Sequence, residues 1–187
     1  MAVMELDARD LLTVANGFAA APAATRRELR RFLARAVMHL QAEVVERTPK
    51  ARGALQRSII GNVVDMPGLG VEGVVGSSLA HAAPVELGTR PHWAPIEPLK
   101  DWVRAKANLE GVYFDGVTGK RPRNQAGRDA KEAAIERIAR QVQVAIARRG
   151  TLGVGMFHGA MAANAGWIKG EFSDCAARIA ALTGGAQ

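Results

Sequence analysis

The chain has 187 residues, 48% of them hydrophobic and 23% charged, and its formal net charge is +7 at pH 7. These values are ordinary for a globular protein and exclude a disordered chain, and the length predicts one domain whose core needs no disulfide. No apolar run reaches the ~18 residues of a membrane span, and the N-terminus is acidic where a signal sequence is basic. We therefore expect a soluble protein that is made in the cytoplasm.

The N-terminal segment, residues 1–24, is expected to be an arm or a short helix. Leu11, Val14 and Phe18 share one face at helical spacing, but the alanine-rich stretch that follows weakens the pattern. A single α+β domain is then expected over residues 25–187.

The strongest helical pattern covers residues 26–46. Thr25 followed by Glu28 is a capping-box pattern, which predicts the start of the helix. Apolar residues then form one continuous stripe, whose burial is worth roughly 1.5–3 kcal/mol for each large side chain, so the helix must pack on another element. His39 lies at the edge of this stripe. We interpret it as a structural residue, because no second metal ligand keeps helical spacing with it.

After this helix the hydrophobic pattern becomes that of β-strands. One strand is predicted at residues 59–64 and a second at 71–75, joined by a turn at 65–68. A third strand is predicted at residues 82–87, ending at Gly88, where a residue without Cβ allows a turn closed to other residues. The fold class that follows is α+β: a small, mainly antiparallel sheet with a long helix packed across it and further helices towards the C-terminus.

Prolines and aromatic residues concentrate between residues 80 and 106. Arg90-Pro91 keeps the chain extended, because the residue before a proline is pushed out of the α region. Glu97-Pro98 predicts the start of a helix, since proline is tolerated at the first helical position and an acidic side chain complements the helix dipole there. By residue type and setting we expect Trp93 and Trp102 to be buried.

The segment 111–127 has the least regular pattern. Asp115-Gly116 favours a tight turn, and Lys120, Arg121 and Arg123 indicate an exposed basic loop. Such a loop is either simply solvated or a contact for phosphate or for an acidic partner.

Two further helices are predicted beyond this loop. The first covers residues 128–148 and stops at Gly150, and the second covers residues 156–182. Cys175, the only cysteine, falls on the apolar face of the second helix. It cannot form an internal disulfide, so we expect a buried, reduced thiol.

The sequence contains no catalytic pattern. His81, His92 and His158 could gather near Glu86, but there is no His-x-x-x-His or Cys-x-x-Cys spacing and no nucleophile elbow. We therefore expect no enzyme, no metal and no cofactor. For Glu86 the sequence leaves two roles open. In the first, it accepts hydrogen bonds from the backbone of the turn after Gly88 or pairs with Arg90 or Arg104. In the second, it forms a salt bridge between subunits.

Three segments carry further motifs in a fixed order. Residues 47–59 include Thr48, Pro49, Gly53, Leu55, Ser58 and Ile59; residues 82–89 read AAPVELGT; and residues 148–160 include Arg149-Gly150, Phe157 and Ala160. In this order they resemble the motifs TPxxTGxLxxSI, YAPYVEFGT and RGxxxxPFxxPA of a phage tail-component family named after gene product ten of coliphage HK-ninety-seven. The sequence departs from these motifs at Arg52, Ala82, Leu87 and the proline pair.

The resemblance implies a structural virion protein at the head-to-tail junction of a long-tailed phage or phage-like particle. Such a tail-completion or neck protein would form a homo-oligomeric ring, of which a hexamer is one form, and would be made in the host cytoplasm. Its implied partners are the tail tube or tail-terminator protein, the head-completion or connector proteins and DNA in the channel, with no membrane. The candidate interface residues are Glu86, Leu87, Gly88, Thr89, Arg90, Trp93, Lys120, Arg121 and Arg123.

The alternative function is a basic DNA-binding module. Its support is the clustering of arginine and lysine at residues 26–35, 47–57 and 120–128, together with a pI near 10.3. A solvated face with ion pairs explains the same clusters, and the sequence leaves both explanations open.

Overall fold

Contacts divide the chain into two compact units in the computed structural model. The first unit is formed by residues 1–49, 55–86 and 154–187, and the second by residues 50–54 and 87–153. The single-domain expectation concerns independent folding, which this division of contacts does not test, so it stays a prediction. The structure describes residues 2–5, 23–50, 53–67, 70–107, 114, 116–117 and 122–184.

A three-stranded antiparallel sheet forms one layer of the first unit, in the order β1-β3-β2. β2 (Ile59–Asp65) and β3 (Val71–Ser77) form a hairpin that is closed by a hydrogen bond from the Met66 amide to the Gly70 carbonyl at 2.9 Å. Both strands confirm the prediction. β1 (Ala2–Glu5) pairs with the other edge of β3, although its residues belong to the segment that was expected to be an arm or helix.

The segment predicted as a third strand is a helix, α4 (Ala82–Leu87), so that prediction was wrong. Pro84 is the third residue of α4, where a missing N–H costs no helical hydrogen bond, whereas in a strand it would remove a ladder donor. Alanine, leucine and glutamate, which make up most of the rest, are good helix formers. The predicted turn residue is confirmed, since Gly88 has a φ of 77°.

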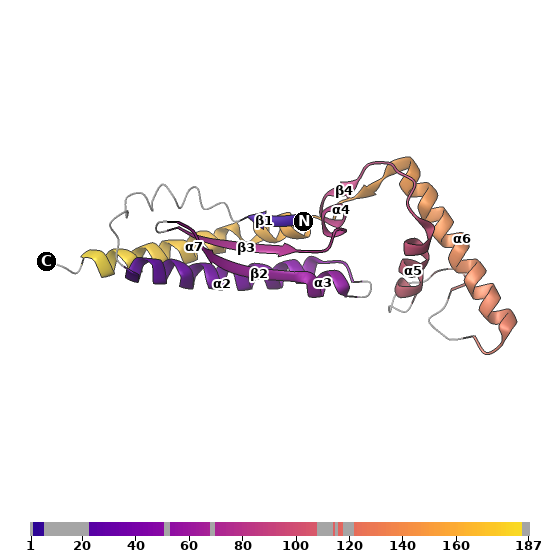
Figure 1. The fold of residues 1–187 in the computed structure, drawn as a ribbon, viewed down its shortest axis with the longest axis horizontal. Helices are drawn as coiled ribbons and strands as arrows, with labels where there is room; N and C mark the ends of the chain where they lie inside the picture. Colours follow the sequence, from indigo (N-terminus) through magenta and orange to yellow (C-terminus); the bar gives the residue numbers. More distant parts are fainter. Residues whose placement is uncertain are drawn as a thin grey trace. The chain divides into compact units, whose positions relative to one another are not determined.

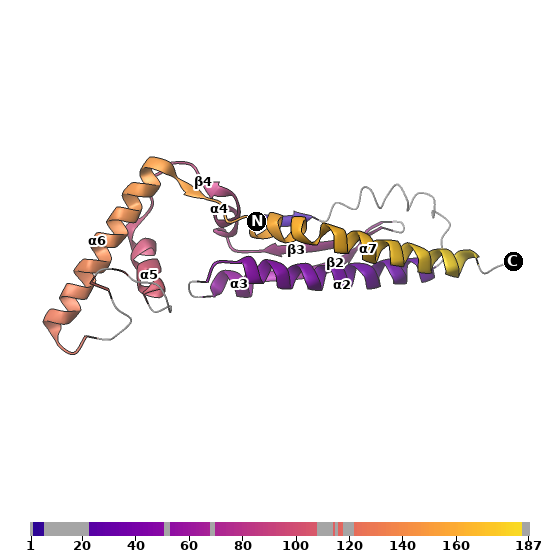
Figure 2. The same ribbon diagram turned by 180° about the vertical axis from the view of Figure 1, so that it is seen from behind.

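Two long helices complete the first unit. α2 (Ala23–Arg47) and α7 (Met156–Gly184) lie side by side, and α2 also packs on β2 and β3 (Figures 1 and 2). A short helix, α3 (Ala54–Ser58), leads into β2. Leu29 of the predicted α2 stripe is only partly buried. The other residues of the stripe are buried as expected: Phe32, Leu33, Ala36, Val37, Leu40 and Val44.

The ends of these two helices differ from the prediction. α2 begins at Ala23, so Thr25 lies inside the helix and does not cap it. Glu28 consequently does not complete a capping box; its carboxylate accepts hydrogen bonds from Arg31 and Arg178. In α7 the buried stripe ends before Leu182, which is 56% exposed because the helix extends past the elements that cover it.

A pair of packed helices forms most of the second unit. α5 (Ile96–Lys106) lies along α6 (Gln125–Arg149), which confirms both predicted helices (Figure 1). Pro98 is the third residue of α5 and not the first. The core between them consists of Val103, Ala107, Val117, Ala134, Ile135, Ile138 and Ala139.

The two tryptophans of this unit contradict the expectation of burial. Trp93 is 67% exposed and Trp102 is 39% exposed. Trp102 lies at the edge of the buried face of α5 and contacts the ring of Phe114, with centroids 6.1 Å apart. Trp93 precedes the helix, next to Ala94, whose carbonyl is bonded by the buried Gln143 side chain at 2.7 Å.

The remaining element of the second unit is a two-stranded ladder. β4 (Gly88–Thr89) pairs antiparallel with β5 (Thr151–Leu152). α6 ends as predicted at Gly150, whose φ is 71°. The fold class is therefore the predicted α+β, and among the described residues no helix combines the length and apolarity needed to cross a membrane.

Candidate interface

Seven of the nine predicted interface residues fall within the described part of the chain, whereas Lys120 and Arg121 lie outside it. Six of the seven lie together in sequence, at the end of α4 and in the extended stretch before α5. Arg123 is exposed immediately before α6. The structure therefore gives geometry for two places, the α4–β4 region and the start of α6.

Glu86 caps helix α7 from a distance. Its carboxylate oxygens accept hydrogen bonds from the backbone amides of Phe157 (2.9 Å) and His158 (3.0 Å), the second and third residues of α7. These are amides that have no partner inside a helix, and a negative charge is favourable at this end of the dipole. One predicted role of Glu86 was to accept backbone hydrogen bonds from the turn after Gly88. Glu86 does accept backbone hydrogen bonds, but they come from α7 and not from that turn.

The sequence before α7 explains why a distant cap is needed. Gly153-Val154-Gly155 offers no Ser, Thr, Asp or Asn side chain to accept from the first turn. The backbone of α4 fixes this segment, since the Val85 carbonyl accepts from Val154 at 2.8 Å and the Glu86 carbonyl from Gly155 at 3.1 Å. The sequence therefore contained one sign of a remote acceptor, namely a predicted helix with no capping side chain before it.

The β4–β5 ladder depends on two glycines at positive φ. A Cβ on Gly88 would lie 2.3 Å from the Thr151 carbonyl oxygen, and one on Gly150 would lie 1.9 Å from the Thr89 carbonyl oxygen. The threonine hydroxyls meet at 3.0 Å across the ladder. Glycine is thus required twice for the two backbones to approach this closely.

Large apolar side chains are exposed around this ladder. Leu87 is 80% exposed, Trp93 is 67% exposed and Leu152 is 96% exposed. Single exposed apolar residues are common, but these three belong to one unit and flank or form one short ladder. Leu152 was missed in the sequence, because a two-residue strand has no periodicity that would identify it.

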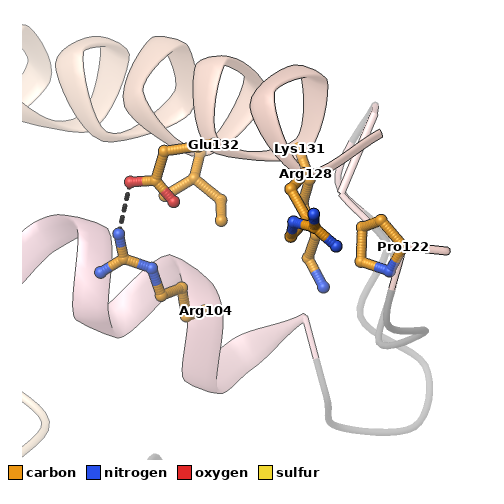
Figure 3. Close-up of a pocket in the computed structure, with 6 residues that line it drawn as sticks. Arg104, Pro122, Arg128, Lys131 and Glu132 are labelled. Atoms are coloured by element: carbon orange, nitrogen blue, oxygen red, sulfur yellow. Dashed lines mark hydrogen bonds and ion pairs between the residues drawn. The ribbon is translucent and has the colours of Figure 1, made fainter. Parts of the chain in front are cut away.

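A cationic cavity lies at the other end of α6. Its volume is about 390 Å³, and its walls come from α5, from Pro122 and from the first turns of α6. Figure 3 shows Arg128 and Lys131 beside Pro122 on one side, and Arg104 paired with Glu132 on the other. Partial burial opposes the charged form of Arg104, but its pairs with Glu132 and Asp101 together outweigh burial, so the pKa of this guanidinium is raised.

His39 and Cys175 have structural surroundings. His39 bonds Asn164 at 2.7 Å and stacks on Trp167, with ring centroids 4.2 Å apart, as expected for a structural residue. The Cys175 thiol is buried, as predicted, and burial raises its pKa. Among the described residues, no group of three or more His, Cys, Asp or Glu side chains is arranged to hold a metal.

The three motif segments meet in one core of the first unit. Leu55 and Ile59 from the first segment and Phe157 and Ala160 from the third belong to the same buried cluster, and Val85 from the second packs against it. Ala82 of the second segment is also buried in this cluster, although it departs from the motif. Segments far apart in the sequence are therefore joined largely by residues that their motifs contain.

Thr48, also a motif residue, is tied to the same core. It is 2% exposed, and its hydroxyl donates to the Val44 carbonyl at 2.6 Å and contacts the Met156 sulfur at 3.3 Å.

Comparisons of this chain with protein families, with curated proteins and with solved structures found no match.

Proposed function

We propose that this chain is a structural protein of the head-to-tail junction of a long-tailed phage or phage-like particle. In this role it is a tail-completion or neck protein that assembles as a ring between the connector and the tail tube. The proposal starts from the resemblance of three sequence segments to the phage tail-component family named above.

The observation that carries the proposal is the meeting of these segments in one core. Matches to short motifs arise by chance, but chance does not require that Leu55 and Phe157 are buried in one cluster and that Val85 packs against it. Residues that fit a family pattern and also form one core are what a shared fold would need. The Glu86 cap on α7 adds a second link between the second and third motif segments.

The exposed apolar side chains around the β4–β5 ladder are the assembly surface that we propose. Interfaces between protein subunits have apolar centres in which aromatic residues are enriched and charged residues are depleted. Leu87, Trp93 and Leu152 have this character, and they lie outside the cores that stabilise the two units. In a ring, these side chains would be covered by a neighbouring copy or by the tube end.

The test measures the mass of the purified chain by mass photometry, first alone and then with isolated tail tubes. The proposal predicts a closed ring or binding confined to the tube end. Leu87→Gln and Leu152→Gln should abolish this assembly without unfolding the chain, because both side chains are exposed. Leu182→Gln, a change at another exposed leucine, is the matched control and should assemble normally. A chain that stays monomeric and ignores tubes would rule out the junction role.

The alternative, a basic DNA-binding module, has its own observation in its favour, namely the concentration of positive charge in the second unit. It predicts DNA binding with a steep salt dependence and no need for a ring partner. The same charge leads to a separate inference about the cavity.

A further inference from the structure

The second unit carries all of the excess positive charge of the chain. Residues 50–54 and 87–153 contain 15 Lys and Arg against 7 Asp and Glu, a net charge of +8, whereas the first unit contains 10 against 11. Self-repulsion of this size destabilises a folded unit and is not needed for its core. An anionic partner would offset the repulsion.

Within this unit, the cavity at the start of α6 is where charge and shape coincide. Arg104, Arg128 and Lys131 line it together with one acid, Glu132, and the apolar Pro122 and Ile135. Arg104 is compensated by its pairs with Asp101 at 2.9 Å and with Glu132. A volume of about 390 Å³ is far more than one water needs and accommodates a phosphate group with its neighbouring sugar.

The side chain of Arg128 is oriented by an uncharged partner. Its Nε and Nη2 atoms donate to the Gln125 side-chain oxygen at 3.0 and 2.7 Å, and that oxygen is neutral. The Gln125 amide nitrogen donates in turn to Asp129 at 2.7 Å, which fixes the orientation of the glutamine. The guanidinium is therefore oriented in advance, which lowers the entropic cost of binding an anion.

The position of these cations on the helix points the same way. The first turn of α6 contains no acidic residue and includes Arg128, and the exposed Arg123 lies just before the N-cap residue Asn124. Cations at the positive end of a helix dipole are unfavourable, whereas a bound anion interacts favourably with that end.

We propose that this cavity binds a phosphate group of a nucleic-acid backbone. Guanidinium groups match the oxygens of a phosphate, and the charge beyond the cavity supplies the contacts with neighbouring phosphates that a free anion would not use. This inference does not depend on the proposed junction role.

An acidic protein surface fits the same region less well. A protein partner would need an apolar contact centre, and the exposed Leu87 and Leu152 lie beyond the opposite end of α6, roughly 30 Å away at 1.5 Å per residue. Nucleic-acid binding needs only cations and groove or backbone contacts, which is what this end of the unit provides.

The test is fluorescence anisotropy of a labelled duplex of random sequence, titrated with the full-length chain at several salt concentrations. Arg128→Gln should weaken binding about tenfold and reduce the slope of log K against log salt by about one. Arg140→Gln is the matched control: it removes an exposed arginine of the same helix that already pairs with Glu136 at 2.8 Å. Circular dichroism of both variants shows whether α6 is intact.

Three results would overturn the inference. The first is equal loss of binding in Arg128→Gln and Arg140→Gln, which indicates a diffuse charge effect. The second is displacement of the duplex by millimolar pyrophosphate or ATP with retention of these anions at 0.3 M salt, which makes a free phosphate compound the ligand. The third is polyglutamate binding that depends on Arg128 as strongly as DNA binding does, which makes the ligand an acidic protein.

Discussion

The first unit holds 10 basic and 11 acidic residues, and the second holds 15 and 7. In the first unit, charges connect elements that the core already brings together, and two buried clusters lie along α2. Among its described residues the second unit has one buried cluster, between α5 and α6, and its net charge is +8. Ion pairs between described elements of the first unit include Arg30–Asp65, Arg35–Glu171 and Arg178–Glu28.

This difference separates the roles of the two units. Charges of the first unit nearly cancel in number, and several of them pair between elements of its fold. Those of the second unit exceed what its core can use, and its apolar side chains Leu87, Trp93 and Leu152 face solvent. Surface that does not serve the fold is where partners bind. Both proposals therefore place partner contacts on the second unit, and the first acts as its scaffold.

The largest expected effect comes from separate truncations in the two cores. Leu40→Ala, at a fully buried position, should cost about 2–5 kcal/mol in the first unit, and Ile135→Ala, at 2% exposure, a similar amount in the second. Trp167 reports on the first unit, and Trp93 and Trp102 report on the second. Each truncation is made in two variants, one in which only Trp167 remains and one in which only the tryptophans of the second unit remain, the others being replaced by phenylalanine. Urea unfolding followed by tryptophan fluorescence should show that each truncation shifts mainly the transition of its own unit.

If Leu40→Ala moved the Trp102 transition as far as the Trp167 transition, the two units would unfold as one. The first and second units would then be two parts of one cooperatively unfolding structure, and the differences in charge and exposure between them would be differences between two surfaces of that structure. Leu182→Ala, at an exposed position of α7, is the control and should change neither transition by more than a few tenths of a kcal/mol.

Two glycines should respond with opposite signs to the same substitution. Gly150→Ala, in the second unit, should destabilise by about 1–3 kcal/mol, because φ is 71° and the new Cβ would lie 1.9 Å from the Thr89 carbonyl oxygen. Gly166→Ala, inside α7 with nothing within 4 Å, should stabilise by up to about 1 kcal/mol. Chemical denaturation measures both. A neutral Gly150→Ala would mean that β4 and β5 do not approach this closely.

The remote cap should be worth less than Gly150. Glu86→Ala removes the acceptor for the Phe157 and His158 amides and should cost about 1 kcal/mol, the usual loss for a helix cap. Exchange of these two amides with solvent deuterium should accelerate in this variant. Glu46→Ala, at an exposed position of α2, should leave their exchange unchanged.

Periodicity predicted the elements whose stability comes from a long buried face. The stripe from Phe32 to Val44 predicted α2, and Ile135 and Ile138 predicted α6, because burial of such faces outweighs local preferences. Periodicity failed at residues 82–87, because six residues are too few to distinguish the helical period from the strand period. The position of Pro84, which suits the first turn of a helix better than a strand, was the remaining indication.

The candidate site was predictable only in part. The α4–β4 residues and Arg123 were selected from motif and charge, but the partners of Glu86 lie about 70 residues along the chain, and no local pattern contains them. Arg128 was assigned to a helix, yet its place in a cavity depends on how α5 packs on α6. Trp93 was expected to be buried from its type alone, and only the neighbouring elements determine exposure.

The smallest effect concerns acid, and it compares one carboxyl from each unit. The Arg178 hydrogen bond lowers the pKa of Glu28, and the Arg140 hydrogen bond lowers that of Glu136. A lowered folded pKa means that the unfolded state binds more protons near pH 4, so stability is present above the ordinary glutamate pKa and is lost as the pH falls through the folded value. Both units should therefore lose stability below about pH 4.

Salt should separate the two. The Glu28 side chain is 10% exposed and the Glu136 side chain 41% exposed, so 0.5 M NaCl should screen the second pair and leave most of the first. Unfolding midpoints from pH 2.5 to 7, read from Trp167 for Glu28→Gln and from Trp102 for Glu136→Gln, test this. Glu28→Gln should flatten the acid dependence at both salt concentrations, whereas Glu136→Gln should do so only at low salt. An equal response to salt in both variants would mean that charges in the first unit are no better protected than those in the second.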